Sequence, residues 1–236
     1  MSLDVVTLRD FYERPLGKLV RRELVQRIRA HWRRAHGTTL VGIGYPTPYL
    51  GSFRGEARAL AAFMPASQGA IIWPNESSVL TALIEDDRLP LADNSVDLML
   101  AVHCLELSDS LRLLLREMWR VLKPEGRLLA IVPNRRGVWA RLERTPFGHG
   151  RPYSASQLDR LLRDALFEPV STDSALHMPP FKRPQLLGVA RTIGRMSARI
   201  GPTFAGVILV EVRKEVSAPT GRAIRETAAE LATAKG

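Results

Sequence analysis

Short apolar runs that alternate with amphipathic segments are the feature that most constrains this chain. Five such runs lie at residues 38–43, 70–73, 81–84, 96–102 and 127–132. They lack the polar alternation of a half-exposed sheet, which is typical of strands buried on both faces. Segments with helical spacing lie between them, so the pattern predicts an α/β fold, with a parallel sheet and helices on both of its faces.

The periodicity also predicts where the other elements lie. Helices are expected at 16–34, 56–64, 111–122, 154–165 and 185–200, and later strands at 170–176 and 205–212, the last of them antiparallel. Ser108 or Asp109 is expected to cap the helix at 111–122, and Ser154 the helix that follows it. From residue 217 the composition predicts a frayed helical tail.

Composition narrows the class of protein. Cys104 is the only cysteine among 236 residues, so no intrachain disulfide can form, and a reducing compartment fits best. We find no signal-peptide pattern and no apolar run of the roughly 18 residues that a membrane span needs, so a cytoplasmic protein is expected. The net charge of +10 favours anionic partners, such as nucleic acid, an anionic membrane surface or an acidic small molecule, but it also fits a basic solubilising surface.

Three motifs between residues 84 and 127 carry the most information. They read EDDRLP at 85–90, DNSVD at 93–97 and LKPEG at 122–126. In order and spacing they resemble the class I S-adenosylmethionine-dependent methyltransferases, of the group called methyltransferase type 11. The likeness spans residues 38–133, and the apolar run at 206–212 resembles the final antiparallel strand of that family. Val96 and Glu125 are minor departures from the family pattern.

The resemblance implies a Rossmann-like, seven-stranded and mostly parallel sheet. Residues 1–37 would form a basic helical lid, residues 38–214 the methyltransferase-like domain, and residues 215–236 a flexible tail. S-adenosylmethionine would lie over the ends of the first three strands, with S-adenosylhomocysteine as the product. In the family, the acid at Glu85 or Asp86 holds the adenine amino group through a charge-assisted bond, and the segment from His103 to Glu106 lines the methionine side. The residues expected at the cofactor are Gly42, Gly44, Tyr45, Pro46, Trp73, Glu85, Asp86, Asp87, His103 and Cys104.

The glycine-rich cofactor loop of that family is degenerate in this sequence. Where the family has Asp-x-Gly-x-Gly-x-Gly, this chain has Gly42 at the acid, keeps Gly44, and has Pro46 and Pro48 at the other glycines. Proline offers no amide donor and fixes φ near −65°, so the loop must follow a different path. At the predicted end of the second strand, Trp73 and Pro74 stand where the family has the acid that binds the ribose. Loss of that acceptor should weaken cofactor binding by about 2 kcal/mol.

Candidate acceptor and base residues lie on either side of this region. His103 and His149 are candidate general bases, because imidazole titrates near neutral pH. Tyr12, His149, Arg151 and Tyr153 are candidate acceptor-binding residues and suit an anionic or planar substrate. The sequence has no His/Cys cluster at metal-ligand spacing, so no metal is expected. Each group also has a structural interpretation: an acidic surface turn for 85–87, a packed histidine for His103 and a pinned surface loop for 147–153.

The predicted activity is methyl transfer to an O, N or C nucleophile of a small-molecule acceptor. The main alternative is a catalytically inactive relative that binds or regulates another protein, because Pro46, Pro48 and Trp73 depart from the cofactor-binding pattern. Nucleic-acid binding through the basic segments 16–34 and 191–199 is least favoured, since Trp32 is the only aromatic residue there that could stack on a base.

Overall fold

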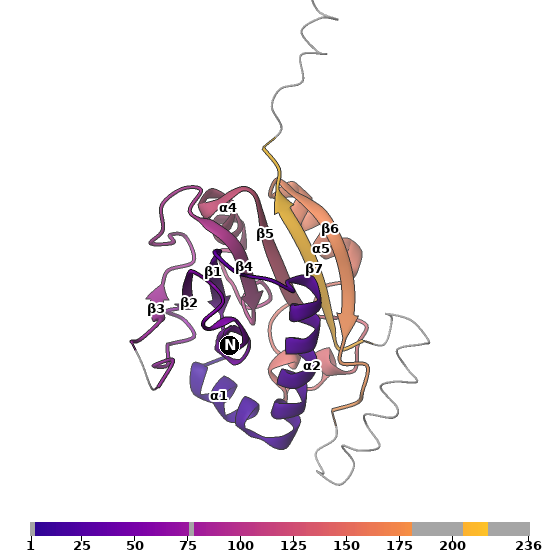
Figure 1. Cartoon of the computed structure of the whole chain (residues 1–236). Helices are drawn as coiled ribbons and strands as arrows, with labels where there is room; N and C mark the ends of the chain where they lie inside the picture. Colours follow the sequence, from indigo (N-terminus) through magenta and orange to yellow (C-terminus); the bar gives the residue numbers. More distant parts are fainter. Residues whose placement is uncertain (1–2, 76–77, 181–204, 217–236) are drawn as a thin grey trace, which may run out of the picture.

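A seven-stranded sheet organises the computed structural model, which describes residues 3–75, 78–180 and 205–216. The strands are β1 (Thr39–Gly44), β2 (Ala59–Pro65), β3 (Thr81–Ile84), β4 (Val96–Val102), β5 (Leu122–Pro133), β6 (Phe167–Ala175) and β7 (Val207–Lys214). Their order is β3-β2-β1-β4-β5-β7-β6, parallel from β3 to β5, and β7 runs antiparallel to both of its neighbours (Figure 1). The expected Rossmann-like sheet with an antiparallel last strand is confirmed.

Helices cover both faces of the sheet (Figure 1). The helices α1 (Val5–Glu13) and α2 (Pro15–His31) pack on one face, and α4 (Leu111–Val121) and α5 (Ala155–Asp164) pack on the other. The short helix α3 (Thr47–Leu50) and three single 3₁₀ turns, at Gly51–Phe53, Trp139–Arg141 and Pro146–Gly148, complete the described elements. None of the helices described has the length and apolar character needed to cross a membrane.

The helix α1 was not predicted. It packs against α2, which corresponds to the helix expected at 16–34. Asp4 caps α1, because its carboxylate accepts from the Thr7 amide at 2.8 Å. Pro15 begins α2 at the position where a missing N–H costs nothing. At Gly17 the two helices approach so closely that a Cβ would lie 2.0 Å from the Phe11 carbonyl oxygen. This close contact fixes the end of α1 that carries Tyr12.

Two predictions between residues 56 and 73 were wrong. The segment 56–64, predicted as a helix, contains most of strand β2, and the segment 70–73, predicted as a strand, has no regular structure. Alanine favours helices, and Ala59–Ala62 misled the prediction, but pairing with both β1 and β3 overrides that local preference. The segment 70–75 instead runs back beside the start of β3, where the Leu80 amide donates to the Trp73 carbonyl oxygen.

The half of the sheet around β2 and β3 carries little helical cover. Among the described residues, no helix connects β2 to β3 or β3 to β4, and only α3 and one 3₁₀ turn connect β1 to β2. Apolar side chains are correspondingly exposed there: Ile72 is 69% exposed and Leu83 56%. The site described below lies at the border of this thinly covered half.

The later elements follow the predictions more closely. Ser154 caps α5 in a reciprocal capping box with Gln157, and the strands expected at 170–176 and 205–212 are β6 and β7. The cap expected from Ser108 or Asp109 was wrong: Ser110 precedes α4 without a side-chain cap, and the Ser108 hydroxyl donates to Asp86 instead. The helix expected at 185–200 and the tail after 217 lie outside the described residues.

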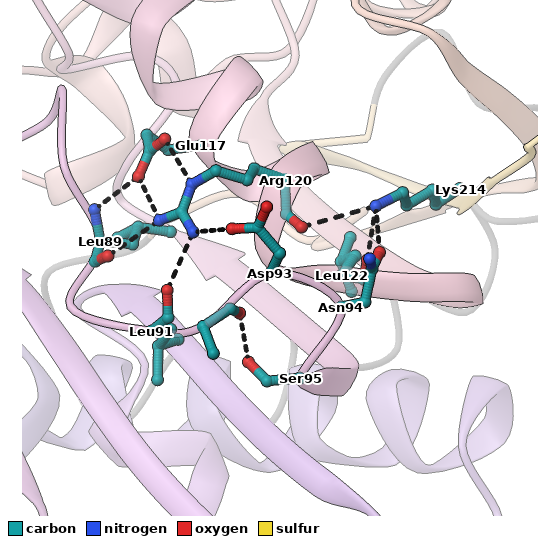
Figure 2. A network of polar contacts seen from close by, with 10 residues as sticks. Leu89, Leu91, Asp93, Asn94, Ser95, Glu117, Arg120, Leu122 and Lys214 are labelled. Carbon is teal, nitrogen blue, oxygen red and sulfur yellow. Dashed lines mark hydrogen bonds and ion pairs between the residues drawn. The ribbon is translucent and has the colours of Figure 1, made fainter.

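Arg120 of α4 organises the loop between β3 and β4, which carries two of the three sequence motifs (Figure 2). Its guanidinium donates to the carbonyl oxygens of Leu89 and Leu91 and to the carboxylates of Asp93 and Glu117. The Glu117 side chain also accepts from the Leu89 amide at 2.9 Å. The Leu-Pro and Asp-Asn-Ser parts of the motifs therefore have a structural role here, and they position the acids that precede them.

Replacing Arg120 with alanine should lower the free energy of unfolding by about 2 kcal/mol, because two part-buried carbonyl oxygens lose their donor. Urea denaturation measures the change. Arg116→Ala on the same helix, whose guanidinium makes no such bonds in the described structure, is the control and should change stability by less than about 0.5 kcal/mol. Equal losses in the two variants would contradict this role of Arg120.

Candidate functional site

The turn after β1 is pressed against the end of β4. Gly44 has φ +90°, and a Cβ there would lie 2.2 Å from the Val102 carbonyl oxygen. The Tyr45 amide donates to that same oxygen at 2.8 Å, so the Val102 carbonyl already has a donor within the protein. At Gly42 a Cβ would lie 2.4 Å from Cβ of Pro46, so the proline ring takes the space into which an acid at position 42 would project. The two departures from the family pattern are thus complementary to each other.

The turn after β2 carries no acid. Because β2 ends at Pro65, the residues at the position of the ribose-binding acid are Ala66, Ser67 and Gln68, not Trp73 as predicted. Gln68 is buried, and its side-chain amide donates to the His103 carbonyl oxygen at 2.5 Å. The Gln68 carbonyl oxygen accepts from the Val5 amide at 2.8 Å. Since β1 lies between β2 and β4, these contacts join the turns on either side of the end of β1.

Tyr12 connects α1 to the end of β4. Its hydroxyl lies 2.6 Å from that of Tyr49 and 2.8 Å from Nε2 of His103, and all three side chains are buried. Burial raises the pKa of Tyr12 well above its ordinary value, so the phenol remains protonated. His103 itself has φ +50°, a left-handed backbone conformation that is costly without glycine and that clusters at functional sites.

A buried carboxylate completes this group of side chains. Glu106 is 2% exposed, and its Oε1 lies 3.5 Å from Nδ1 of His103. Among the described residues, neither carboxylate oxygen of Glu106 nor Nδ1 of His103 has a hydrogen-bond partner. Buried polar groups without partners are costly, and native proteins tolerate few of them. We therefore regard Glu106 and His103 as candidate functional groups. Glu106 ends the segment that is expected beside the methionine end of the cofactor, although no role of its own was predicted for it.

The predicted acids line a cavity of about 240 Å³ between the ends of β2 and β3, which we call the smaller cavity. Its walls include Ala66 and Ser67 after β2, Glu85, Asp86 and Asp87 after β3, and Ser110 before α4. Asp86 is half-buried and is held by the Ser108 hydroxyl, whereas Glu85 is exposed. The cavity therefore presents carboxylates at the carboxyl edge of the sheet, where open α/β sheets bind ligands.

A cavity of about 640 Å³, which we call the larger cavity, is lined by residues of α1, α2, the turn after β1 and the segment 71–75. Its walls include Arg9, Tyr12 and Glu13 of α1, Arg21 of α2, Tyr45 and Trp73. Burial raises the pKa of Tyr45 to about 12. Of the residues expected at the cofactor, Tyr45 and Trp73 thus line the larger cavity, while Glu85, Asp86 and Asp87 line the smaller one.

The remaining candidates lie outside the linings of these two cavities. His149 lines a third cavity of about 130 Å³ with Phe11 and Glu143, and its Nε2 lies 2.6 Å from the Glu143 carbonyl oxygen. Tyr153 donates to the Leu105 carbonyl oxygen, and burial raises the pKa of its phenol. The Arg151 amide donates to the Glu106 carbonyl oxygen. The Cys104 thiol is buried, which raises its pKa and makes it a packing group.

Several members of the site were not predicted. Gln68 was missed because β2 was placed too late in the chain, and Tyr49 because nothing in the sequence distinguishes it from a core tyrosine. No group of three or more potential metal ligands occurs within the part of the chain that the structure describes.

The chain resembles known methyltransferases. Residues 42–130 match the family model described as a methyltransferase domain. A search among curated proteins gave no match. A methyltransferase from Archaeoglobus fulgidus, described as S-adenosylmethionine-dependent, has a similar solved structure, with 15% identity and a TM-score of 0.61 over 89% of this chain and all of the other.

Two enzymes with named substrates have similar structures. Geranyl diphosphate C-methyltransferase from Streptomyces coelicolor, solved with S-adenosylhomocysteine, is 17% identical, with a TM-score of 0.56 over 81% of this chain and 76% of the other. 1,6-Didemethyltoxoflavin-N1-methyltransferase from Burkholderia thailandensis is 16% identical, with a TM-score of 0.52 over the same shares. This chain therefore has the fold of the S-adenosylmethionine-dependent methyltransferases, and its residues 42–130 match the methyltransferase-domain model.

Proposed function

We propose that this protein is an S-adenosylmethionine-dependent methyltransferase, and that Glu85 and Asp86 hold the adenine end of the cofactor. The observation that supports this most is the smaller cavity between the ends of β2 and β3, whose lining includes four acidic residues: Glu85, Asp86, Asp87 and Asp109. A carboxylate that accepts from the exocyclic amine of adenine makes a strong, charge-assisted bond. Structures with this fold include methyltransferases solved with S-adenosylhomocysteine, which fits the proposal.

The described residues fit the two ends of the cofactor unequally. The adenine end has a cavity and acids, whereas Gln68 and the turn at Gly44 close the space across the end of β1. Binding of the whole cofactor therefore requires the Gln68 amide to leave the His103 carbonyl oxygen. Because only molecules with this contact open can bind, the apparent affinity for the cofactor is reduced in proportion to the fraction of open molecules.

The chemistry that S-adenosylmethionine supplies when bound is an electrophilic methyl group on a sulfonium. The protein contributes alignment and exclusion of water. Tyr12, Tyr49 and His103 are buried, and the Tyr12 hydroxyl is hydrogen-bonded to both of the others, so a proton can be held away from solvent between the Tyr12 hydroxyl and Nε2 of His103. The Glu106 carboxyl group lies on the other side of the imidazole, with its Oε1 3.5 Å from Nδ1 of His103.

Calorimetric titration with S-adenosylhomocysteine tests the proposal. We expect wild-type protein to bind it, and the variant with Glu85→Ala and Asp86→Ala to bind at least tenfold more weakly, because the adenine amine loses its acceptors. The control carries Asp164→Ala and Glu168→Ala, which remove two charges near β6, at the edge of the sheet opposite β3. It should bind S-adenosylhomocysteine as wild type does. Equal affinities of all three proteins would contradict the proposed adenine site.

The second candidate function is binding or regulation of another protein by a chain that binds no cofactor itself. Three observations favour it. The packing of Pro46 on Gly42 and the contact of Gln68 with His103 fill space that the family uses for the ribose and methionine. The turn after β2 also lacks the acid that would bind the ribose. No heat at millimolar S-adenosylhomocysteine, from protein that remains folded, would support this candidate over the enzyme.

A further inference from the structure

The larger cavity has one apolar wall. The segment after β2 contributes Ile71, Ile72 and Trp73 to this wall, and Ile72 is 69% exposed. Exposed apolar side chains that gather along a cavity are typical of ligand-binding sites. Trp73 adds a flat aromatic surface, on which a planar group can stack.

The opposite wall carries the charged side chains of Arg9 and Glu13 on α1 and of Arg21 on α2. The Arg21 Nε donates to the Pro48 carbonyl oxygen at 2.8 Å, which orients the guanidinium. The two terminal nitrogens of Arg21 have no partner among the described residues. Arg9 is already paired with Asp10 at 3.0 Å, so Arg21 is the cation that remains available to a ligand. An oriented guanidinium with two free donor nitrogens matches a carboxylate.

The cavity also lies next to the candidate reactive group. Tyr12 lines it, and the Tyr12 hydroxyl lies 2.8 Å from Nε2 of His103. We infer that the larger cavity is the acceptor site and that it takes a planar aromatic carboxylate, whose ring lies against Trp73 and whose carboxylate binds Arg21. This inference rests on the proposed methyltransferase function, because only that function gives the protein an acceptor.

Two probes of similar shape but different charge test the inference: 2-naphthoate and 2-naphthamide. We expect wild-type protein to bind the carboxylate at least tenfold more tightly than the amide, as measured by saturation-transfer NMR titration. Arg21→Gln should weaken naphthoate binding about tenfold and leave naphthamide unchanged, while Trp73→Leu should weaken both. Arg22→Gln, the next residue on α2 and not part of the cavity wall, is the matched control and should have no effect.

Arg21→Lys serves as a second variant, because it keeps the charge but loses the forked donor geometry. We expect it to bind naphthoate with an affinity between those of wild type and Arg21→Gln. Equal binding of the two probes, or equal losses from Arg21→Gln and Arg22→Gln, would overturn the inference.

Adding S-adenosylhomocysteine separates this inference from the proposed function. We expect both ligands to bind at once, and Arg21→Gln to bind S-adenosylhomocysteine as wild type does. If naphthoate and S-adenosylhomocysteine exclude each other, the larger cavity is not the acceptor site, and the inference fails while the methyltransferase proposal stands. If S-adenosylhomocysteine does not bind at all, the proposed function fails and with it the acceptor role, even if naphthoate still depends on Arg21.

Discussion

Replacement of Gly42 by alanine is expected to lower the free energy of unfolding by about 3 kcal/mol. The added Cβ would lie 2.4 Å from Cβ and 2.5 Å from Cγ of Pro46, and 2.9 Å from Cδ1 of Leu50. Overpacking of this kind in a buried turn displaces backbone and side chains. The Leu50 methyl group can move, but the proline ring is part of the turn itself. Urea denaturation followed by circular dichroism measures the loss.

The double variant Gly42→Ala, Pro46→Gly tests whether the two positions are coupled. Pro46→Gly alone should lower the free energy of unfolding by about 1 kcal/mol, because glycine increases the conformational entropy of the unfolded chain. Since the glycine removes the ring that meets the new Cβ, the double variant should be at least 1 kcal/mol more stable than the sum of the single changes implies. Additive losses would contradict the complementary packing of Gly42 and Pro46.

The second large effect is expected at Glu211 of β7, which joins the end of α2 to the sheet. Its buried carboxylate accepts from Trp32 at 3.0 Å and from Arg127 at 3.1 Å, and it lies 3.1 Å from Nδ1 of His31. Glu211→Ala leaves the buried Trp32 N–H without an acceptor and opens a cavity, so we expect a loss of about 3 kcal/mol at neutral pH.

The stability that Glu211 contributes should depend on pH. Burial raises the pKa of this carboxyl, but the hydrogen bonds from His31, Arg127 and Trp32 outweigh it, and the pKa lies below its ordinary value. A lowered pKa means that the contribution is complete above the ordinary pKa of about 4.3 and is lost as the pH falls through the lowered value. The wild type should therefore lose the charge-dependent part of its advantage over Glu211→Ala between about pH 4.3 and pH 2.

Glu211→Gln keeps the shape and one acceptor oxygen, so it should cost less than the alanine variant. Its stability should also change less with pH in the acid range, since it has no carboxyl to titrate. A constant difference between wild type and Glu211→Ala from pH 7 to pH 2 would contradict the charged role of Glu211.

Most of the sheet could be predicted because its strands carry their own signals. The runs at 96–102 and 127–132 are apolar except for Asp97 and Arg127, and the structure places them at the centre of the sheet as β4 and β5. The second strand could not be found, because Ala59–Ala62 reads as a helix in isolation and becomes a strand only through its neighbours. Local preference is decisive only where tertiary pairing agrees with it.

The site was predictable only in part. The acids at 85–87 follow a strand, and their place at the edge of the sheet follows from topology. The contact between Gln68 and His103 joins residues 35 apart in the sequence, and the one between Tyr12 and His103 joins residues 91 apart. Such contacts depend on how α1 packs over the strand ends, which no local pattern encodes.

Backbone hydrogen–deuterium exchange with and without saturating S-adenosylhomocysteine tests the central claim, that the adenine end of the cofactor binds between β2 and β3. The account predicts slower exchange at residues 85–88 and 108–111 around the smaller cavity, and changed exchange at 66–69 as the Gln68 contact opens. Protection confined to residues 9–13 and 71–75 of the larger cavity, or no change at 85–88 at millimolar ligand, would contradict it.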